Sequence, residues 1–419
     1  MSPPDCSAEG TIHSFMLQFT RRDAVVKDYK PPTQAEFDFV LYKMLKLYEP
    51  ARWELPEDWN SYDSFLEIVR ELDKTSSPGI PYCKEQPSIG KWLEWDGLQS
   101  NPDKIARLWY DVQKVIVGEW QHEFRVFVKQ ELHVEKKARE GRWRLITAVS
   151  LPVQVAWHMC FKIQNNKFIE TLYQTPSFQG FVAMGGGWKR LRRYMEYKKL
   201  NHCLDKSSWD VNAPGWVFLL TLEFRKRTCK NFDQPWFSEW SRLATALYQD
   251  AYNDAVLTFP DGSRFQQNFI GFQKSGVVNT ISDNSLMQVE LHIAACQRLG
   301  IQISNIIATG DDTVQEEIPD EYIDVLQELG CVVKELVVGK QFMGFDHENF
   351  SPIYPHKHIA NLAYQKPAFI PETLGAYLHW YVHHPYYNRW VATARALGLD
   401  PGSKFSHQYW LDNPQALDD

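Results

Sequence analysis

A Gly-Asp-Asp turn between two short strand-like segments constrains the fold of this chain more than any other feature. The apolar segment ISNIIA at 303–308 precedes the turn, and TVQEEI at 313–318 follows it directly. Strand, glycine-containing turn and strand are typical of an antiparallel β-hairpin. Gly310 gives the turn the backbone freedom that a tight tip needs. The sequence therefore predicts a hairpin that projects the carboxylates of Asp311 and Asp312 into a cleft.

The elements around this hairpin predict an α+β fold. A short strand covers 201–205, a helix begins near Pro214, and a further helix covers about 277–300. After the hairpin, a helix at 320–329 leads into the strand CVVKEL. The order β-α-α-β-β-α-β is typical of an antiparallel sheet with helices on one face.

The rest of the chain is predicted to be mostly helical, with one further pair of strands. Strands at 124–128 and 142–149 flank a charged excursion, and helical patterns occupy 34–72 and 153–170. Three successive glycines at 185–187 form a turn before a basic helix. The last 60 or so residues are rich in Trp, Tyr and His and are predicted to be helical.

Length and cysteine content narrow the class of protein. The chain has 419 residues, enough for one large domain or for two to three subdomains around connected cores. The seven cysteines are scattered without a CxxC pair, which argues against a zinc knuckle or a disulfide framework and favours a reducing, intracellular setting. No apolar run reaches the roughly 18–20 residues of a membrane span, and the N-terminal sequence lacks a signal-peptide pattern.

The net charge of −7 argues against a protein that simply coats nucleic acid, yet two stretches are locally basic. Residues 129–144 hold six Lys or Arg against three Glu, and residues 188–199 hold six against one. Two solvated helix faces are one interpretation. Because both stretches lie beside the motifs described below, we favour the interpretation that their basic side chains line a channel that binds phosphates.

Asp205 and Asp210 extend the carboxylate pattern of the hairpin. Asp205 ends a short apolar strand, and Asp210 precedes the helix near Pro214. If the chain turns after Asp205, both carboxylates line one cleft. Two divalent metals about 4 Å apart need carboxylates from separate elements to clamp the oxygens of an in-line displacement. We expect Asp205, Asp311 and Asp312 to supply these carboxylates. The alternative for Asp205 and Asp210 is that they cap the helix near Pro214.

A Ser-Gly loop leads into the helix at 277–300. Ser275 and Gly276 form the loop, and Thr280 and Asn284 follow on one helix face, four residues apart. A hydroxyl beside an amide is suited to reading the 2′-hydroxyl of a ribose, which both donates and accepts hydrogen bonds. A capped helix with polar side chains turned outward is the alternative.

The charged excursion between the strands at 124–128 and 142–149 is a candidate phosphate site. It includes Lys and Arg side chains, which hold triphosphates and neutralise the charge that develops in phosphoryl transfer. Alternation along the second strand predicts that Arg142, Arg144 and Ile146 share one face. A solvated basic hairpin is the alternative.

In this order, the motifs resemble those of the RNA-dependent RNA polymerases of positive-strand RNA viruses, most of all the sobemovirus/polerovirus-like group. Each motif is weak alone, but five or more in the correct order are specific. The matching segments, from about residue 75 to 350, are a template-channel motif at Thr75–Pro81, a fingertip motif at Lys129–Ile146, D-x₄-D at Asp205–Asp210, S-G-x₃-T-x₃-N at Ser275–Asn284, the Thr309–Asp312 turn, Lys334, and a loose match at 342–345.

The resemblance implies a right-hand polymerase fold, in which an antiparallel-sheet palm carries the catalytic motifs between fingers and thumb. By position, the fingers would comprise 1–150 and an insertion at 216–270. The palm would comprise 151–215 and 271–358, and the thumb would comprise 359–419.

The resemblance also implies roles for individual residues. The expected metal ligands are Asp205, Asp311 and Asp312, with Asp312 secondary. Lys334 would be the general acid toward pyrophosphate. The residues expected to hold the incoming NTP or to select its ribose are Asp210, Ser275, Gly276, Thr280, Asn284, Lys129, Lys137, Arg142 and Arg144. Two positions depart from the pattern: His133 stands where related enzymes often have Arg, and Lys340 competes with Lys334.

The implied reaction is template-directed attack of an RNA 3′-hydroxyl on the α-phosphate of an NTP. Two Mg²⁺ would organise it, with Mn²⁺ as the alternative. The implied partners are template and product RNA and NTPs, with a protein primer and other viral replication proteins as further candidates. The implied location is the host cytoplasm, with membrane-associated replication sites as one variant.

Two rival hypotheses stay open at this point. A reverse transcriptase would share the hand shape, but an enzyme that excludes ribose usually places a bulky side chain where Asp210 and Asn284 stand. A catalytically inactive RNA-binding protein would retain only the fold. The presence of Asp205, Asp311 and Asp312 argues against it.

Overall fold

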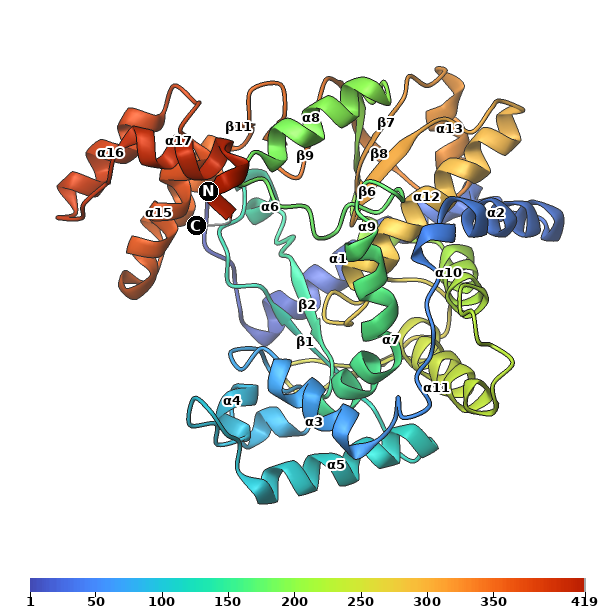
Figure 1. The fold of residues 1–419 in the computed structure, drawn as a ribbon. Helices are drawn as coiled ribbons and strands as arrows, with labels where there is room; N and C mark the ends of the chain where they lie inside the picture. The colour runs from blue at the N-terminus through green and yellow to red at the C-terminus, as the bar shows by residue number, and fades with distance from the viewer. Residues whose placement is uncertain (418–419) are drawn as a thin grey trace.

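The computed structural model describes residues 1–417, and four of its strands form a central antiparallel sheet (Figure 1). Across this sheet the strand order is β6 (Ile306–Thr309), β7 (Asp312–Gln315), β3 (His202–Lys206) and β8 (Val333–Val338). Leu204 on the inner strand lies opposite Thr313 on one side and Leu336 on the other. The predicted antiparallel sheet is therefore present.

The predicted hairpin is also present, but its strands are shorter than expected. Thr309 pairs with Asp312 across the turn, and Gly310 at the tip has φ +61°. Residues 303–305 lie outside β6. There the backbone N–H of Glu316 still donates to the Asn305 carbonyl oxygen at 3.1 Å, but the Glu316 carboxylate accepts the N–H of Asn305 at 3.0 Å, so a side chain replaces one of the two backbone bonds of this pair.

Helices cover both faces of the central sheet, not one face as predicted. On one face, α12 (Thr280–Leu299) and α13 (Glu321–Glu328) pack in the main core, which contains Leu204 and Ile306. On the other, α8 (Gly187–Tyr197) packs against Cys203, Ile307 and Val314. The alternation of side chains along β3 and β6 sends successive apolar residues into these two separate cores.

A second sheet is formed by β2 (Leu145–Ala148), β1 (Phe124–Val128), β4 (Val256–Thr258) and β5 (Arg264–Gln266), in that order. It confirms the strand predicted at 124–128, whereas the strand predicted at 142–149 is shorter. Arg142 and Arg144 precede β2, so they do not share a strand face with Ile146 as expected. A small third sheet contains β9 (Gln341–Phe342), β10 (Phe345–Asp346) and β11 (Ser351–Pro352).

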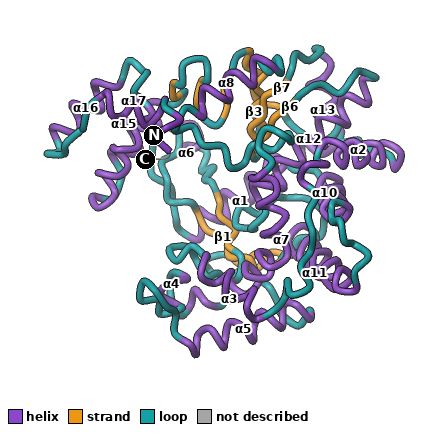
Figure 2. The backbone as a smooth tube through the Cα atoms, viewed as in Figure 1, coloured by secondary structure: helices purple, strands orange, loops and turns teal. Residues whose placement is uncertain are grey.

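The remaining helices surround these sheets, as the tube view shows (Figure 2). They confirm the helical predictions at 34–72, at 153–170 and in the C-terminal segment. In chain order they are α1 (Ala8–Val25), α2 (Gln34–Leu47), α3 (Tyr62–Glu71), α4 (Ile89–Trp92), α5 (Pro102–Val117), α6 (Glu135–Arg139), α7 (Leu151–Glu170), α9 (Trp209–Asn212), α10 (Gly215–Arg227), α11 (Pro235–Tyr252), α14 (Pro355–Ala363), α15 (Ile370–Trp380), α16 (Tyr387–Ala396) and α17 (Lys404–Asp412).

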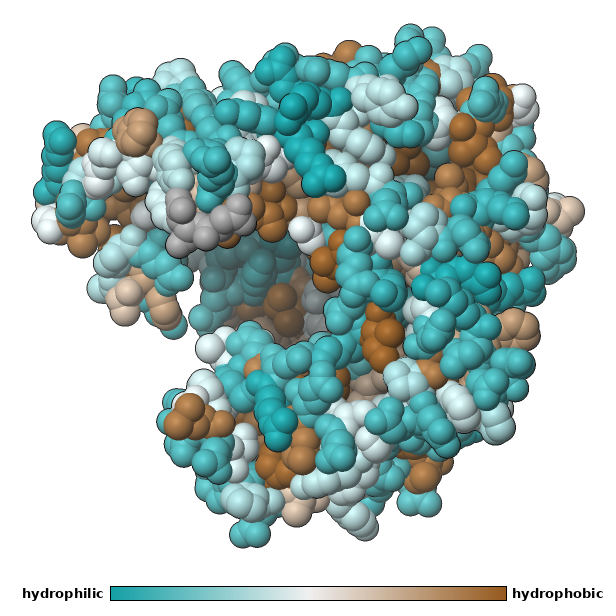
Figure 3. Space-filling view, viewed as in Figure 1, coloured by the Kyte–Doolittle hydropathy of each residue, from teal (hydrophilic) through white to brown (hydrophobic). Residues whose placement is uncertain are grey.

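A hollow opens on the face shown in Figure 3, between the C-terminal helices and helices α3 and α4. The C-terminal helices have a core of their own, which includes Leu374, Tyr377 and Trp390. They lie beside α8, with which α17 is in contact. Among residues 1–417, no helix is both long enough and apolar enough to cross a bilayer.

Helix α12 places the carboxyl group of Glu290 inside the protein core. Glu290 is fully buried, and the hydroxyl of Thr221 on α10 donates to its Oε1 at 2.8 Å. Burial raises the pKa of Glu290 well above its usual value. The folded state therefore holds this proton more tightly than the unfolded chain does.

This environment predicts a pH dependence of stability. Because the folded-state pKa is raised, the free energy of unfolding of the wild type falls as the pH rises above the usual value for glutamate. Glu290→Gln lacks this proton equilibrium, so its stability relative to wild type should increase from pH 5 to pH 8. Urea unfolding at both values measures the difference. Glu57→Gln at an exposed position is the matched control, and a parallel response of the two variants would contradict the prediction.

Candidate active site

Three carboxylates meet where the central sheet ends. Asp205 lies near the end of β3, Asp311 lies at the hairpin tip, and Asp312 begins β7. All three line a cavity of about 210 Å³. The antiparallel pairing of β3 with β7 causes this proximity, because Leu204 lies opposite Thr313, the residue after Asp312.

Each carboxylate has a different electrostatic environment. Asp205 is exposed, and Lys334 Nζ on the neighbouring strand β8 donates to its Oδ2. The half-buried Asp312 accepts the backbone N–H of Met343 at 2.6 Å. Burial raises the pKa of Asp312 to about 7, and Asp311 and Asp205 add to this rise against the opposing amide and a nearby lysine. The cluster therefore carries negative charge that a cation would stabilise.

A buried lysine, Lys206, lies next to this cluster and was not among the predicted site residues. Its side chain is 6% exposed, and its Nζ donates to Thr313 Oγ1 and, at 3.3 Å, to the Leu204 carbonyl oxygen. Burial lowers the pKa of Lys206, while Cys331 and the three carboxylates act to raise it. The sequence places this lysine directly after Asp205, but gives no sign that its side chain is buried.

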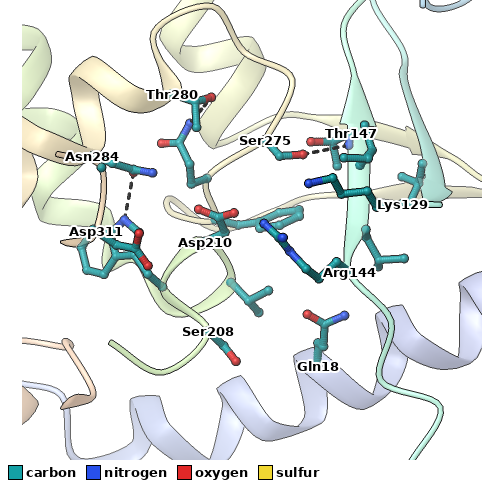
Figure 4. A pocket seen from close by; sticks show the side chains of 18 of the residues that line it. Gln18, Lys129, Arg144, Thr147, Ser208, Asp210, Ser275, Thr280, Asn284 and Asp311 are labelled. Carbon is teal, nitrogen blue, oxygen red and sulfur yellow. Dashed lines mark hydrogen bonds between the residues drawn. The ribbon is translucent and has the colours of Figure 1, made fainter. Parts of the chain in front are cut away.

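A larger cavity of about 710 Å³ adjoins the hairpin tip (Figure 4). Asp311 lines both cavities, so the carboxylates and the larger space adjoin at the hairpin tip. Of the residues predicted to bind the nucleotide, those that line the larger cavity are Lys129, Lys137, Arg144, Asp210, Ser275, Thr280 and Asn284. Segments far apart in the sequence are thus brought together as expected.

Asp210 and Asn284 lie near each other in the lining of this cavity (Figure 4). The indole N–H of Trp209 donates to Asn284 Oδ1 at 2.9 Å, which fixes the orientation of the amide. Burial raises the pKa of Asp210 to about 6 and Asp311 adds to the rise, whereas Arg144 and a hydrogen bond with Asn284 oppose it. An acceptor and an amide donor are therefore held side by side.

The loop before α12 lies directly against strand β2. Ser275 Oγ accepts the backbone N–H of Thr147 at 3.3 Å, and a Cβ on Gly276 would lie 2.2 Å from the carbonyl oxygen of Thr147. Only glycine fits there without a shift of the backbone. Thr280 Oγ1 donates to the carbonyl oxygens of Lys274 and Val277, so its hydroxyl hydrogen closes the turn. Because these bonds hold the preceding residues in a turn, α12 begins at residue 280.

Basic side chains gather on the opposite wall. Glu131 holds Lys129 at 2.9 Å and Arg144 at 2.7 Å. His133 stands where related enzymes often have arginine. It accepts the backbone N–H of Arg144 at 2.9 Å and so helps to position that residue. Burial lowers the pKa of Lys137, and four neighbouring cations lower it further, among them Arg144 and Lys334. The wall is therefore strongly electropositive around Lys137.

The structure does not bring every predicted residue to the site. Arg142 and Gly276 are absent from the residues that line the larger cavity. Arg142 pairs with Glu140 at 3.2 Å, yet it lies close enough to Lys137 to lower the pKa of that lysine. Lys340 pairs with Glu196 and Glu348, so Lys334 is the lysine that contacts the carboxylates.

The second basic stretch, residues 188–199, lines neither of the two cavities described above, and its expected place along a channel stays a prediction. Its helix α8 buries Trp188, Leu191 and Met195 against the protein interior. This amphipathic pattern turns charged residues such as Arg190 and Arg193 to the outer surface.

The carboxylates suit Mg²⁺ in their chemistry, although they are not arranged as a closed cage. Within residues 1–417, no group of three or more His, Cys, Asp or Glu side chains is already positioned to hold a metal ion. Lys334 and the Met343 amide engage two of the carboxylates instead. Mg²⁺ usually takes one or two carboxylates and completes its shell with water and substrate phosphates. Asp205, Asp311 and Asp312 fit that kind of open site.

Comparison with known proteins identifies the family. The sequence model described as viral RNA-dependent RNA polymerase matches residues 27–330. The chain belongs to this family.

Individual relatives agree with this assignment. Protein P2-P3 of Poinsettia latent virus is 27% identical over 79% of this chain, and Protein P1-P2 of Potato leafroll virus is 26% identical over 82%. The chain spans 32% and 34% of their lengths. The RNA-directed RNA polymerase of Mushroom bacilliform virus is 27% identical over 62% of this chain and 60% of its own length.

The fold agrees with a solved viral enzyme. The Sicinivirus 3Dpol RNA-dependent RNA polymerase superposes with a TM-score of 0.73, covering 92% of this chain and 87% of the other at 16% identity. This confirms the α+β right-hand polymerase fold predicted from the motifs. The boundaries of fingers, palm and thumb stay a prediction.

The close approach of Gly276 to β2 gives a testable prediction. Gly276→Ala should lower the free energy of unfolding by about 1–3 kcal/mol, the usual cost of overpacking. Gly339→Ala is the matched control, because a Cβ there would meet nothing within 4 Å. Denaturant unfolding of both variants measures the effect. Equal stability of the two would show that the loop does not depend on this contact.

Proposed function

We propose that this chain catalyses RNA-templated RNA synthesis by transfer of nucleotides from NTPs to an RNA 3′-hydroxyl. The observation that carries the proposal is that the carboxylate cluster adjoins the basic cavity at Asp311. Carboxylates lie at one end, basic side chains lie on one wall, and Asp311 lines both cavities. Phosphoryl transfer needs both kinds of group, because the protein acts mainly through positioning and charge stabilisation.

The basic wall is the proposed site of the triphosphate. Lys129, Lys137 and Arg144 line the cavity, and their charges attract and orient phosphate oxygens. Lys334 lies close enough to lower the pKa of Lys137 while it contacts Asp205. Its ammonium is therefore the candidate proton donor to the leaving pyrophosphate.

Asp205 and Asp311, with Asp312 as a secondary ligand, would hold the Mg²⁺ or Mn²⁺ ions. Bound there, these metals would activate the attacking hydroxyl and neutralise the leaving oxygens. Template RNA, product RNA and NTPs are the ligands that this proposal requires. A protein primer, other viral replication proteins and a cytoplasmic site of replication are compatible with it.

The pair Asp210 and Asn284 favours RNA synthesis over the reverse-transcriptase alternative. Asp210 presents an acceptor beside the amide of Asn284, and Trp209 fixes that amide. A 2′-hydroxyl can donate to the carboxylate and accept from the amide. A deoxyribose lacks this hydroxyl, so it would form neither bond and would bind less tightly in the buried site.

The first prediction from this proposal concerns Asp311. Asp311→Ala should reduce primer extension on an RNA template with Mg²⁺ by at least about a thousandfold, since metal-dependent stabilisation is worth several kcal/mol. Asp324→Ala, an exposed aspartate on α13, is the matched control and should extend normally. An unprimed reaction run in parallel shows whether initiation needs a primer. Normal extension by Asp311→Ala would contradict the proposal that Asp311 holds a metal ion required for RNA synthesis.

The second prediction concerns sugar selection. Asp210→Asn and Asn284→Ala should each reduce the preference for NTP over dNTP by about ten- to a hundredfold, because each removes a hydrogen bond to the 2′-hydroxyl. The ratio of kcat/KM for GTP to that for dGTP measures this preference. An unchanged ratio in both variants would show that the sugar is read elsewhere.

A further inference from the structure

Among the described residues, Lys206 is the one lysine at the carboxylate cluster whose side chain is deeply buried. The side chain of Lys334 is 59% exposed, whereas Lys206 is 6% exposed as a residue. Burial of a cation is unfavourable unless polar partners compensate for lost water. Lys206 has such partners in Thr313 Oγ1 and the Leu204 carbonyl oxygen.

A local irregularity of β3 accounts for the burial. The pairing of β3 with β8 shifts register between Asp205 and Lys206, so that Asp205 lies opposite Glu335 while Lys206 lies opposite Val333. Such a shift re-aims the side chains that follow it. Asp205 is left exposed, and Lys206 turns inward next to the hairpin strand that carries Asp312.

The two lysines differ in whether a metal can displace them. Lys334 reaches Asp205 from the exposed side and can swing into solvent when the carboxylate binds a cation. Lys206 is enclosed, lines the large cavity beside Asp311, and is tied to Thr313 on the neighbouring strand. Its side chain therefore stays at the cluster when Lys334 moves away.

We propose that Lys206 is a resident cation of the metal centre. It weakens the binding of divalent metal by the free protein, so that full metal loading depends on the phosphates of the incoming NTP. The carboxylate cluster carries negative charge, and the ammonium of Lys206 offsets part of it. A triphosphate restores the missing negative charge when it enters the cavity. This inference rests on the proposed function and assigns a positioning and charge-setting role to a residue outside the predicted set.

The ammonium has a second effect through Thr313. Lys206 on β3 and Thr313 on β7 join the strand of Asp205 to the strand of Asp312 by a side-chain bond, in addition to the pairing of the two backbones. Removal of the hydroxyl alone keeps the charge and loses the link. Removal of the ammonium loses both. The two effects can therefore be separated by substitution.

Mn²⁺ titration of the full chain without nucleotide, followed by electron paramagnetic resonance of the free ion, tests the proposal. Lys206→Met should bind Mn²⁺ about tenfold more tightly than wild type, because a neighbouring positive charge is lost. Lys206→Gln, a neutral residue that keeps a hydrogen-bonding group, should show the same change and decides the matter if the methionine variant does not fold. Lys206→Arg, which retains the charge, should keep the weak binding of wild type.

Two controls isolate the charge effect. Lys46→Met removes an exposed lysine from α2 and should leave the affinity for Mn²⁺ within about twofold of wild type, although net charge changes equally. Thr313→Val keeps the ammonium, so it should also leave the affinity nearly unchanged. A similar gain in both controls and in Lys206→Met would overturn a specific role for Lys206.

RNA synthesis by the wild type, measured in the same preparations, separates the two proposals. If wild type makes RNA with Mg²⁺ while the neutral Lys206 variants bind Mn²⁺ no more tightly than it does, the inference about Lys206 is wrong and the proposed function stands. If wild type neither binds Mn²⁺ nor makes RNA, the proposed function itself fails and the inference falls with it.

Discussion

The pairing of β3 with its two antiparallel neighbours is the constraint on which the rest of the site depends. β3 contributes Asp205, β7 follows the hairpin tip with Asp312, and β8 supplies Lys334. A slip of one residue in either pairing would turn these side chains to the opposite face of the sheet. Register is protected because apolar side chains on both faces are buried, against α12 and α13 on one side and against α8 on the other.

The cavity for the nucleotide is built around this sheet edge by contacts of a different kind. Gly276 allows the loop before α12 to lie against β2, and Trp209 fixes the amide of Asn284. On the opposite wall, Glu131 gathers Lys129 and Arg144. The carboxylates, the groups proposed to read the sugar and those proposed to bind phosphate therefore come from separate elements, each held by its own contacts.

Much of this arrangement could be predicted from the sequence, and the failures have physical causes. Hairpin, antiparallel sheet and the order of motifs follow from local patterns, which placed Asp205 and Asp311 in one site. Arg142 was misplaced because strand alternation was extended beyond the true start of β2, and the residue pairs with Glu140 instead. Lys206 was missed because its burial follows from a register shift that depends on strand partners and not on local sequence. The basic helix α8 was read by charge alone, although its apolar stripe decides which side faces outward.

The most direct test of the account is to locate bound Mn²⁺ by anomalous scattering in crystals of the chain with template, primer and a non-hydrolysable NTP. The account predicts metal density between Asp205 and Asp311, with triphosphate oxygens facing Lys137 and Arg144 and Lys334 no longer bonded to Asp205. Metal at another position, or an ordered triphosphate that leaves Asp205 paired with Lys334, would contradict it.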